Sequence, residues 1–138
     1  MKFTYEVEGG NFAKAGNAAS GVKKVLKQLN VDPKVIKRIV VALYEGEVNV
    51  VAHAYKGQVL VDIDTNRIQI RIEDEGPGIP DIDLAMQVGY STASAMVREM
   101  GFGAGMGLPN MKRNADNIEI TSKVGEGTVV ELTTKLIS

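Results

Sequence analysis

A carboxylate and a carboxamide lie four residues apart in the segment 45–49, which reads EGEVN. If this segment is helical, Glu45 and Asn49 share one face of the helix, and Glu47 points elsewhere. An amide oxygen can help to hold a hard cation while a neighbouring carboxylate orients or deprotonates a hydroxyl nucleophile. The alternative is the solvated stripe of an amphipathic helix, which is the commoner role of such residues in isolation. His53 extends the same face by one turn, although a lone histidine more often has a structural role.

A second candidate site is the segment 74–80, DEGPGIP, which directly follows an apolar alternating stretch. Gly76 and Gly78 allow a flat ligand to approach the backbone, and the Asp74 carboxylate could accept a hydrogen bond from that ligand. Taken alone, these residues are more typical of a turn that ends a strand. The segment 125–128, GEGT, which contains Thr128, is by itself typical of a hairpin turn.

Glycine is concentrated between Gly76 and Gly107, and the run 101–110 reads GFGAGMGLPN. Alternating glycines before a helix can present successive backbone N–H groups to phosphate oxygens. The run is not a P-loop, because no Gly-Lys-Ser/Thr ends it. It is not a dinucleotide fingerprint either, because Met106 or Leu108 falls where glycine is needed and no strand precedes it. A surface loop is the alternative.

The elements that must position these residues follow from the spacing of apolar side chains. Alternation predicts a strand over 1–8, a hairpin of 59–63 with 68–72, and a last hairpin of 118–120 with 130–136. Helical spacing predicts helices over 11–29, 33–55 and 108–116, with Asp32-Pro33 as the N-cap and first turn of the second. We expect a loop over 73–80 and helical pieces at 83–88 and 95–100. This order predicts an α/β (α+β) two-layer sandwich, in which one mixed, largely antiparallel sheet carries helices on one face.

The same periodicity predicts which helical residues are buried. On the first helix they are Phe12, Ala15, Ala19, Val22, Leu26 and Leu29, and on the second Ile36, Ile39, Val40, Leu43, Val50, Val51 and Ala54.

Composition narrows the classes of function. The chain has 138 residues, 44% hydrophobic and 24% charged, which suits one folded domain. A net charge of −1 argues against nucleic-acid binding. The absence of cysteine excludes thiol nucleophiles and thiolate metal sites and fits a cytoplasmic protein. No stretch approaches the roughly 18 apolar residues of a membrane span or has the form of a signal peptide, so no membrane partner is expected.

In order and spacing, the four motifs resemble the boxes of the Bergerat ATP-binding fold. The matching patterns are Glu45-x3-Asn49, Asp74-x-Gly76-x-Gly78, Gly103-x-Gly105-x-Gly107 and Gly127-Thr128. That fold is shared by histidine-kinase catalytic domains, the gyrase B subunit and the anti-sigma-factor serine kinases. The resemblance covers about residues 35–135. It implies a single domain over 1–138, with a glycine-rich ATP lid at about 80–107.

Within that superfamily the chain is most similar to the small bacterial serine kinases of partner-switching modules. The similar segments are 89–92 (GYST), 105–113 (GMGLPNMKR) and 118–128 (IEITSKVGEGT). Those enzymes transfer the γ-phosphate of ATP to a serine or threonine of a partner with the STAS fold. The chain departs from them by a longer segment between Thr92 and Gly101, inside the lid. The alternatives are an anti-sigma factor that sequesters a sigma factor, and an ATP-gated protein-binding module without transfer activity. A homodimer is compatible with each.

The resemblance also implies roles. Asn49 would ligate Mg²⁺, Glu45 would act as general base, Asp74 would accept the adenine amine, and Thr128 would contact the same site through water. The other expected nucleotide contacts are His53, Gly76, Gly78, Ile79, Arg98, Gly103, Gly105, Met106, Gly107 and Leu108, with Arg98 as a candidate cation over the γ-phosphate. We expect Asn49→Ala to abolish Mg-dependent nucleotide binding and Glu47→Ala to leave it nearly intact.

Overall fold

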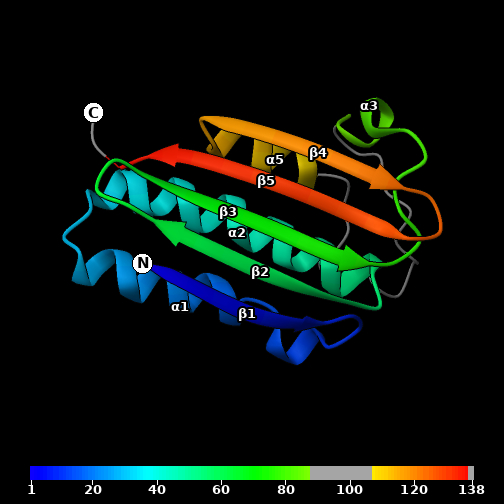
Figure 1. Ribbon diagram of the computed structural model, residues 1–138, viewed down its shortest axis with the longest axis horizontal. Coiled ribbons are helices and arrows are strands. Elements are labelled where there is room, and N and C mark those ends of the chain that lie inside the picture. The colour runs from blue at the N-terminus through cyan, green and yellow to red at the C-terminus, as the bar shows by residue number, and fades with distance from the viewer. Residues whose placement is uncertain (88–106, 137–138) are drawn as a thin grey trace.

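The centre of the molecule is a five-stranded sheet in the order β1-β2-β3-β5-β4, in which all neighbouring strands are antiparallel (Figure 1). The computed structural model describes residues 1–87 and 107–136. The strands are β1 (Lys2–Glu8), β2 (Lys56–Ile63), β3 (Arg67–Glu75), β4 (Asn117–Lys123) and β5 (Gly127–Lys135). The predicted strand and the two predicted hairpins are therefore confirmed.

Three helices cover one face of this sheet, with the longest of them in the middle (Figure 1). They are α1 (Asn17–Gln28), α2 (Pro33–His53) and α5 (Gly107–Asn114), and α1 and α5 both pack against α2. The shorter pieces are a 3-10 turn, η1 (Phe12–Lys14), and α3 (Ile82–Ala85). As expected, Asp32 caps α2: its side chain accepts a hydrogen bond from the Lys34 N–H at 2.8 Å. The two-layer architecture is the one that the sequence predicts.

The first predicted helix is shorter than expected, because α1 begins at Asn17 and not at residue 11. Gly16 adopts a left-handed conformation with φ of 100° and interrupts the helical path. Phe12 and Ala15 keep the helical spacing of apolar side chains but belong to the 3-10 turn η1 and the residue that follows it.

The second difference is at β3, which continues to Glu75 where the sequence predicts a loop from residue 73. Residues 73–75 pair with residues 58–56 of β2, so the ladder extends three residues beyond the apolar alternation. Asp74 therefore lies within a strand, which fixes the direction of its side chain more firmly than a loop would. The predicted helical piece at 95–100 lies outside the described residues.

The core lies between the sheet and the three helices. Its fully buried large side chains include Val22, Leu26, Ile39, Leu43, Val50, Val59, Val61, Ile68, Ile70 and Met111. Gly46 lets α2 lie close to the sheet: a Cβ there would be 2.3 Å from the Cδ1 of Ile72 and 3.2 Å from the Sδ of Met111. Val40 of α2 and Ala54, which follows it, are only partly buried. The prediction that Leu29 is buried is wrong: it follows the last residue of α1 and is 43% exposed. Within the described ranges, no helix combines the length and apolarity that crossing a bilayer requires.

Candidate functional site

Asp74 lies one residue before the end of β3, opposite Gly57 of β2. Its Oδ1 accepts a hydrogen bond from the backbone N–H of Thr128 on β5, at 3.1 Å. Burial raises the pKa of the Asp74 carboxyl, and the hydrogen bond from Thr128 opposes that rise only in part. A carboxylate has acceptor capacity for more than one donor. Asp74 can therefore accept a further hydrogen bond from a ligand.

A pair of hydroxyl groups supports Asp74 from the β4–β5 hairpin. Thr128 is buried, and its Oγ1 lies 2.8 Å from the Oγ of Ser122, its partner in the strand register. The Ser122 hydroxyl also accepts from the Ile79 N–H at 2.7 Å and lies 3.1 Å from the Gly127 carbonyl oxygen. Because a serine has one hydroxyl proton, donation to Gly127 requires Thr128 to donate to Ser122. Ser122 thus joins the loop after β3 to the hairpin.

The sequence interpretation gave Ser122 no role. The signal was present in the hairpin spacing, since a turn centred on residues 124–127 places Ser122 opposite Thr128.

The loop after β3 is fastened to the β4–β5 turn by backbone hydrogen bonds. The Gly76 N–H donates to the Glu126 carbonyl at 3.1 Å, and the Gly125 N–H donates to the Pro77 carbonyl at 2.9 Å. Gly78 has a φ of 76°, and a Cβ there would lie 2.5 Å from the Lys123 carbonyl oxygen. The contact between the loop and the hairpin therefore requires glycine at position 78, independently of any role in ligand binding.

The predicted face of α2 carries Glu45, Asn49 and His53, all partly buried. Asn110 of α5 donates from Nδ2 to the Glu45 Oε1 at 3.3 Å. Gly107, the first residue of α5, lies beside the other oxygen, since a Cβ there would be 3.7 Å from the Glu45 Oε2. The start of α5 and the Glu45 carboxylate are thus neighbours. Asn110 is a second residue that the sequence interpretation quoted in a motif without assigning a function.

Asn49 and His53 differ in their availability for a ligand. In the part of the chain that the structure describes, the Asn49 side chain has no hydrogen-bond partner, so its amide oxygen is available to a cation. Burial lowers the pKa of His53, which favours the neutral imidazole at pH 7. His53 is therefore a polar group and not a cation at this end of α2.

Glu47 points to the other side of α2 and is 2% exposed. Its carboxylate accepts hydrogen bonds from the backbone N–H groups of Gly16 (3.0 Å), Ala18 (3.1 Å) and Ala19 (3.1 Å). Glu47 thus caps the N-terminus of α1, where Gly16 offers no side chain for the purpose. Glu47→Ala removes this structural contact, so the expected small effect on nucleotide binding stays a prediction for the protein that remains folded.

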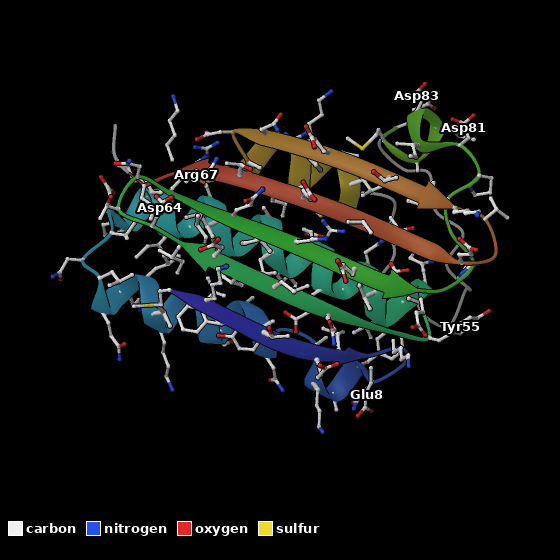
Figure 2. The ribbon with its side chains drawn as sticks, in the orientation of Figure 1. Glu8, Tyr55, Asp64, Arg67, Asp81 and Asp83 are labelled. Atoms are coloured by element: carbon white, nitrogen blue, oxygen red, sulfur yellow. The ribbon has the colours of Figure 1, made fainter. Side chains whose placement is uncertain are left out.

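Asp74 with its supports Thr128 and Ser122, and the α2 face that carries Glu45, Asn49 and His53, lie at the same end of the molecule. Asp74 and Val50 both border Gly57: a Cβ there would be 3.0 Å from the Val50 Cγ1 and 3.4 Å from the Asp74 Cβ. Tyr55, which follows α2, marks this end in Figure 2, and the β2–β3 turn with Asp64 and Arg67 marks the opposite end.

Of the remaining expected contacts, Gly76, Gly78, Ile79 and Gly107 lie in the loop after β3 or at the start of α5. The Leu108 side chain belongs to the core, so only its backbone can meet a ligand. Arg98, Gly103, Gly105 and Met106 lie outside the described residues.

No group of three or more His, Cys, Asp or Glu side chains among residues 1–87 and 107–136 could hold a metal ion. A Mg²⁺ ion takes only one or two protein ligands when substrate phosphates and water complete its octahedron. The amide oxygen of Asn49 is one protein ligand of the kind that such an ion uses.

Residues 11–134 match the family of the histidine kinase-like ATPase domain. The serine/threonine-protein kinase RsbT of Bacillus subtilis (strain 168) is 35% identical over 113 residues, which cover 79% of this chain and 79% of RsbT. An anti-sigma F factor of Thermoanaerobacter sp. (strain X514) is 32% identical over 141 residues, which cover 96% of this chain and 95% of that protein. A crystal structure of the RsbU and RsbW domains of a Mycobacterium tuberculosis protein matches with a TM-score of 0.67 and 17% identity, over 99% of this chain and 32% of that one. This last likeness concerns the fold alone.

Proposed function

Because the chain belongs to the histidine kinase-like ATPase family, we propose that it binds Mg-ATP and transfers the γ-phosphate to a serine or threonine of a STAS-type partner in a bacterial partner-switching module. The observation that carries this proposal is the position of Glu45. Its carboxylate is held by Asn110 beside Gly107, one helical turn before Asn49 and at the end of the molecule that carries Asp74.

The adenine end of the proposed site is Asp74 with its supports. The Asp74 Oδ1 accepts from the Thr128 N–H, so the other oxygen is left for the exocyclic amine of adenine. Guanine carries a carbonyl at that position, which would face an acceptor with another acceptor. The site should therefore prefer ATP to GTP.

The phosphate end of the proposed site is formed by α2 and the start of α5. Asn49 would be a ligand of Mg²⁺, which neutralises phosphate charge when it is bound. Glu45 would take the proton of the partner's hydroxyl while the hydroxyl oxygen bonds to the γ-phosphorus. The bond from that phosphorus to the β–γ bridging oxygen breaks, and ADP leaves with the electron pair. The Asn110 amide would keep the Glu45 carboxylate oriented during the transfer.

A second function is favoured by the names of several relatives, which are anti-sigma F factors. In this alternative the chain sequesters a sigma factor in addition to, or instead of, phosphorylating a partner. We propose the kinase activity first because the potential base and metal ligand are both present at the expected spacing.

The direct test is incubation of the protein with labelled Mg-ATP and purified candidate partners. Label on a serine or threonine of a STAS-domain protein supports the kinase. Retention of a sigma factor in the presence of ATP, without label transfer to any STAS protein, supports the anti-sigma function and contradicts the first proposal.

Asp74→Asn is expected to weaken ATP binding by roughly 10- to 100-fold, in line with the cost of a mismatched buried hydrogen bond. The amide oxygen would still accept from the Thr128 N–H, so the amide NH₂ would face the adenine amine as donor against donor. The preference for ATP over GTP should shrink as well. Calorimetric titration of both nucleotides into both proteins measures these effects, and unchanged ATP affinity would contradict the role of Asp74.

Urea denaturation of the nucleotide-free proteins is the control for folding. Since burial raises the pKa of Asp74, the wild-type fold loses stability as pH rises from the unfolded value of about 3.9 through the higher folded value. Asparagine is neutral throughout this range. At pH 7 the variant should therefore be at least as stable as the wild type, so that lost binding is not lost folding.

A further inference from the structure

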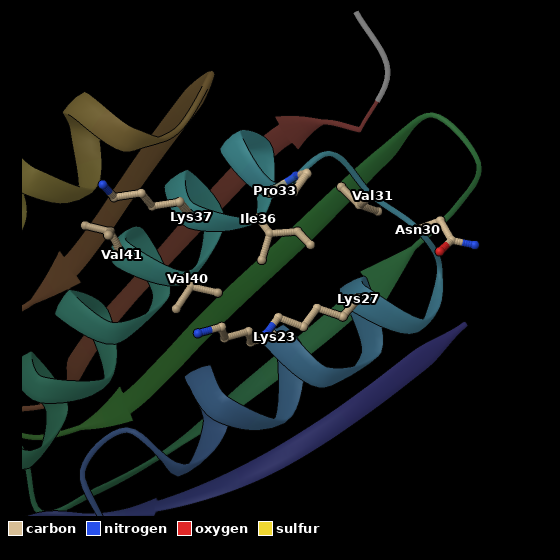
Figure 3. A pocket seen from close by; sticks show the side chains of 9 residues that line it. All are labelled: Lys23, Lys27, Asn30, Val31, Pro33, Ile36, Lys37, Val40 and Val41. Atoms are coloured by element: carbon tan, nitrogen blue, oxygen red, sulfur yellow. The ribbon is translucent and has the colours of Figure 1, made fainter.

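A groove of about 630 Å³ runs between α1 and α2, at the opposite end of the helical layer from Asp74 (Figure 3). Its base is aliphatic, and three lysines stand along its sides. The lining residues are Lys23, Lys27, Asn30, Val31, Pro33, Ile36, Lys37, Val40 and Val41. Figure 3 shows Lys23 and Lys27 on the α1 side and Lys37 on the far side, with Ile36 and Val40 between them.

The groove lies in a strongly basic part of the chain. Every charged side chain from Asn17 to Tyr44 is basic except Asp32, although the whole protein has a net charge of −1. Asp32 is engaged as the cap of α2. Among residues 1–87 and 107–136, Lys23, Lys27 and Lys37 form no ion pair. Their positive charge is therefore available to a partner.

An exposed aromatic residue extends the aliphatic base of the groove. Tyr44 follows Val40 by one helical turn, is 39% exposed and lies over the start of α1, beside Gly16. Partly exposed apolar side chains in a row, flanked by unpaired cations, form a surface suited to a segment that brings both apolar groups and carboxylates.

We propose that this groove binds an acidic amphipathic segment of a protein partner, with apolar side chains against Val40 and Tyr44 and carboxylates beside the three lysines. Nucleic acid fits less well, because a phosphate backbone has nothing to place on an aliphatic base. A membrane surface fits less well because the apolar residues line a concavity and do not protrude.

The groove is a separate site from the nucleotide site of the proposed function. The lining residues of α2, from Pro33 to Val41, lie about 24 to 12 Å from Asn49 along the helix, and Tyr44 lies about 8 Å from it, given the rise of 1.5 Å per residue. A segment in the groove would leave the Asp74 end uncovered. A substitution in the groove can therefore weaken peptide binding without affecting phosphoryl transfer. Measuring ATP binding by each variant shows whether the nucleotide site is still intact.

The test uses a synthetic peptide of about 15 residues, long enough for an amphipathic helix, with leucines on one face and glutamates on the other. Calorimetric titration at physiological salt should detect binding to the wild-type chain. Lys23→Glu combined with Lys27→Glu should weaken binding about tenfold, because two attractive pairs become repulsive. Tyr44→Ala should weaken it as well, and ATP binding should be unchanged in both variants.

The matched control is Lys24→Glu combined with Lys34→Glu. This pair makes the same change in net charge, with Lys24 on α1 and Lys34 on α2, but neither residue lines the groove. If both double variants bind the peptide equally weakly, the proposal is overturned, since the acidic peptide would then be attracted only by the net positive charge of the two helices. So would equal binding of a peptide with glutamine in place of every leucine. Tighter binding of duplex DNA or of phosphatidylserine vesicles than of the peptide would also overturn it.

Discussion

Glu45→Ala is expected to lower phosphoryl transfer to the partner by roughly 10²- to 10⁴-fold, which is the usual contribution of a positioned general base. ATP binding should be nearly unchanged, because the Glu45 carboxylate contacts Asn110 and the start of α5 and not Asp74, against which adenine would bind. Single-turnover label transfer measures the rate, and calorimetry measures the affinity.

Glu45→Gln is the sharper variant. Glutamine keeps an oxygen that can accept from the Asn110 amide at the position of the Glu45 Oε1. It cannot take a proton from the incoming hydroxyl. A loss of similar size in both variants therefore identifies proton transfer as the missing step. Transfer at the wild-type rate by Glu45→Gln would remove Glu45 from the mechanism.

Glu47→Ala is expected to destabilise the fold by about 3 kcal/mol or more. The substitution leaves three backbone N–H groups at the start of α1 without their acceptor, and each unmade hydrogen bond of a buried group costs about 1–3 kcal/mol. Such a loss is a large part of the typical stability of about 5–15 kcal/mol. Urea denaturation followed by circular dichroism measures it.

Two further variants show whether the loss of stability comes from the lost cap of α1 or from the removal of a negative charge. Glu47→Gln retains one acceptor oxygen and should lie between the wild type and Glu47→Ala. Glu126→Ala removes an exposed carboxylate, which among residues 1–87 and 107–136 pairs only with Lys123, at 3.4 Å, and should change stability little. If Glu47→Ala is as stable as Glu126→Ala, the start of α1 does not depend on Glu47. Nucleotide binding by Glu47→Ala is informative only after this measurement.

The strands of the sheet could be predicted from the sequence, and so could the helix boundaries that a nearby capping residue sets. Alternation of apolar residues locates the strands, and Asp32-Pro33 locates the start of α2. The start of α1 could not be predicted in this way. Its apolar spacing continues back to Phe12, and the group that caps the helix is Glu47, which is 31 residues from Gly16 in the sequence. A contact between residues so far apart in the sequence cannot be recognised from the local spacing of apolar side chains.

The candidate site could be predicted in its residue types but not in its supports. The position of Asp74 before two glycines indicates a ligand site, the resemblance adds Thr128, and the structure brings the two together across 54 residues. Ser122 and Asn110 fill polar positions that any surface strand or helix could have, so their residue types do not identify them, although the hairpin spacing places Ser122 opposite Thr128. Their importance comes from what they touch, Thr128 and Glu45.

The fastening of the loop after β3 to the β4–β5 hairpin has a consequence for the thermodynamics of binding. Ser122 accepts a hydrogen bond from the Ile79 N–H, and Gly76 and Pro77 form hydrogen bonds with the hairpin backbone. The backbone around Asp74 is therefore preorganised, and its conformational entropy has already been lost during folding. A base that docks against Asp74 meets an acceptor already in position, so little of its interaction energy is diverted to ordering the protein at that end.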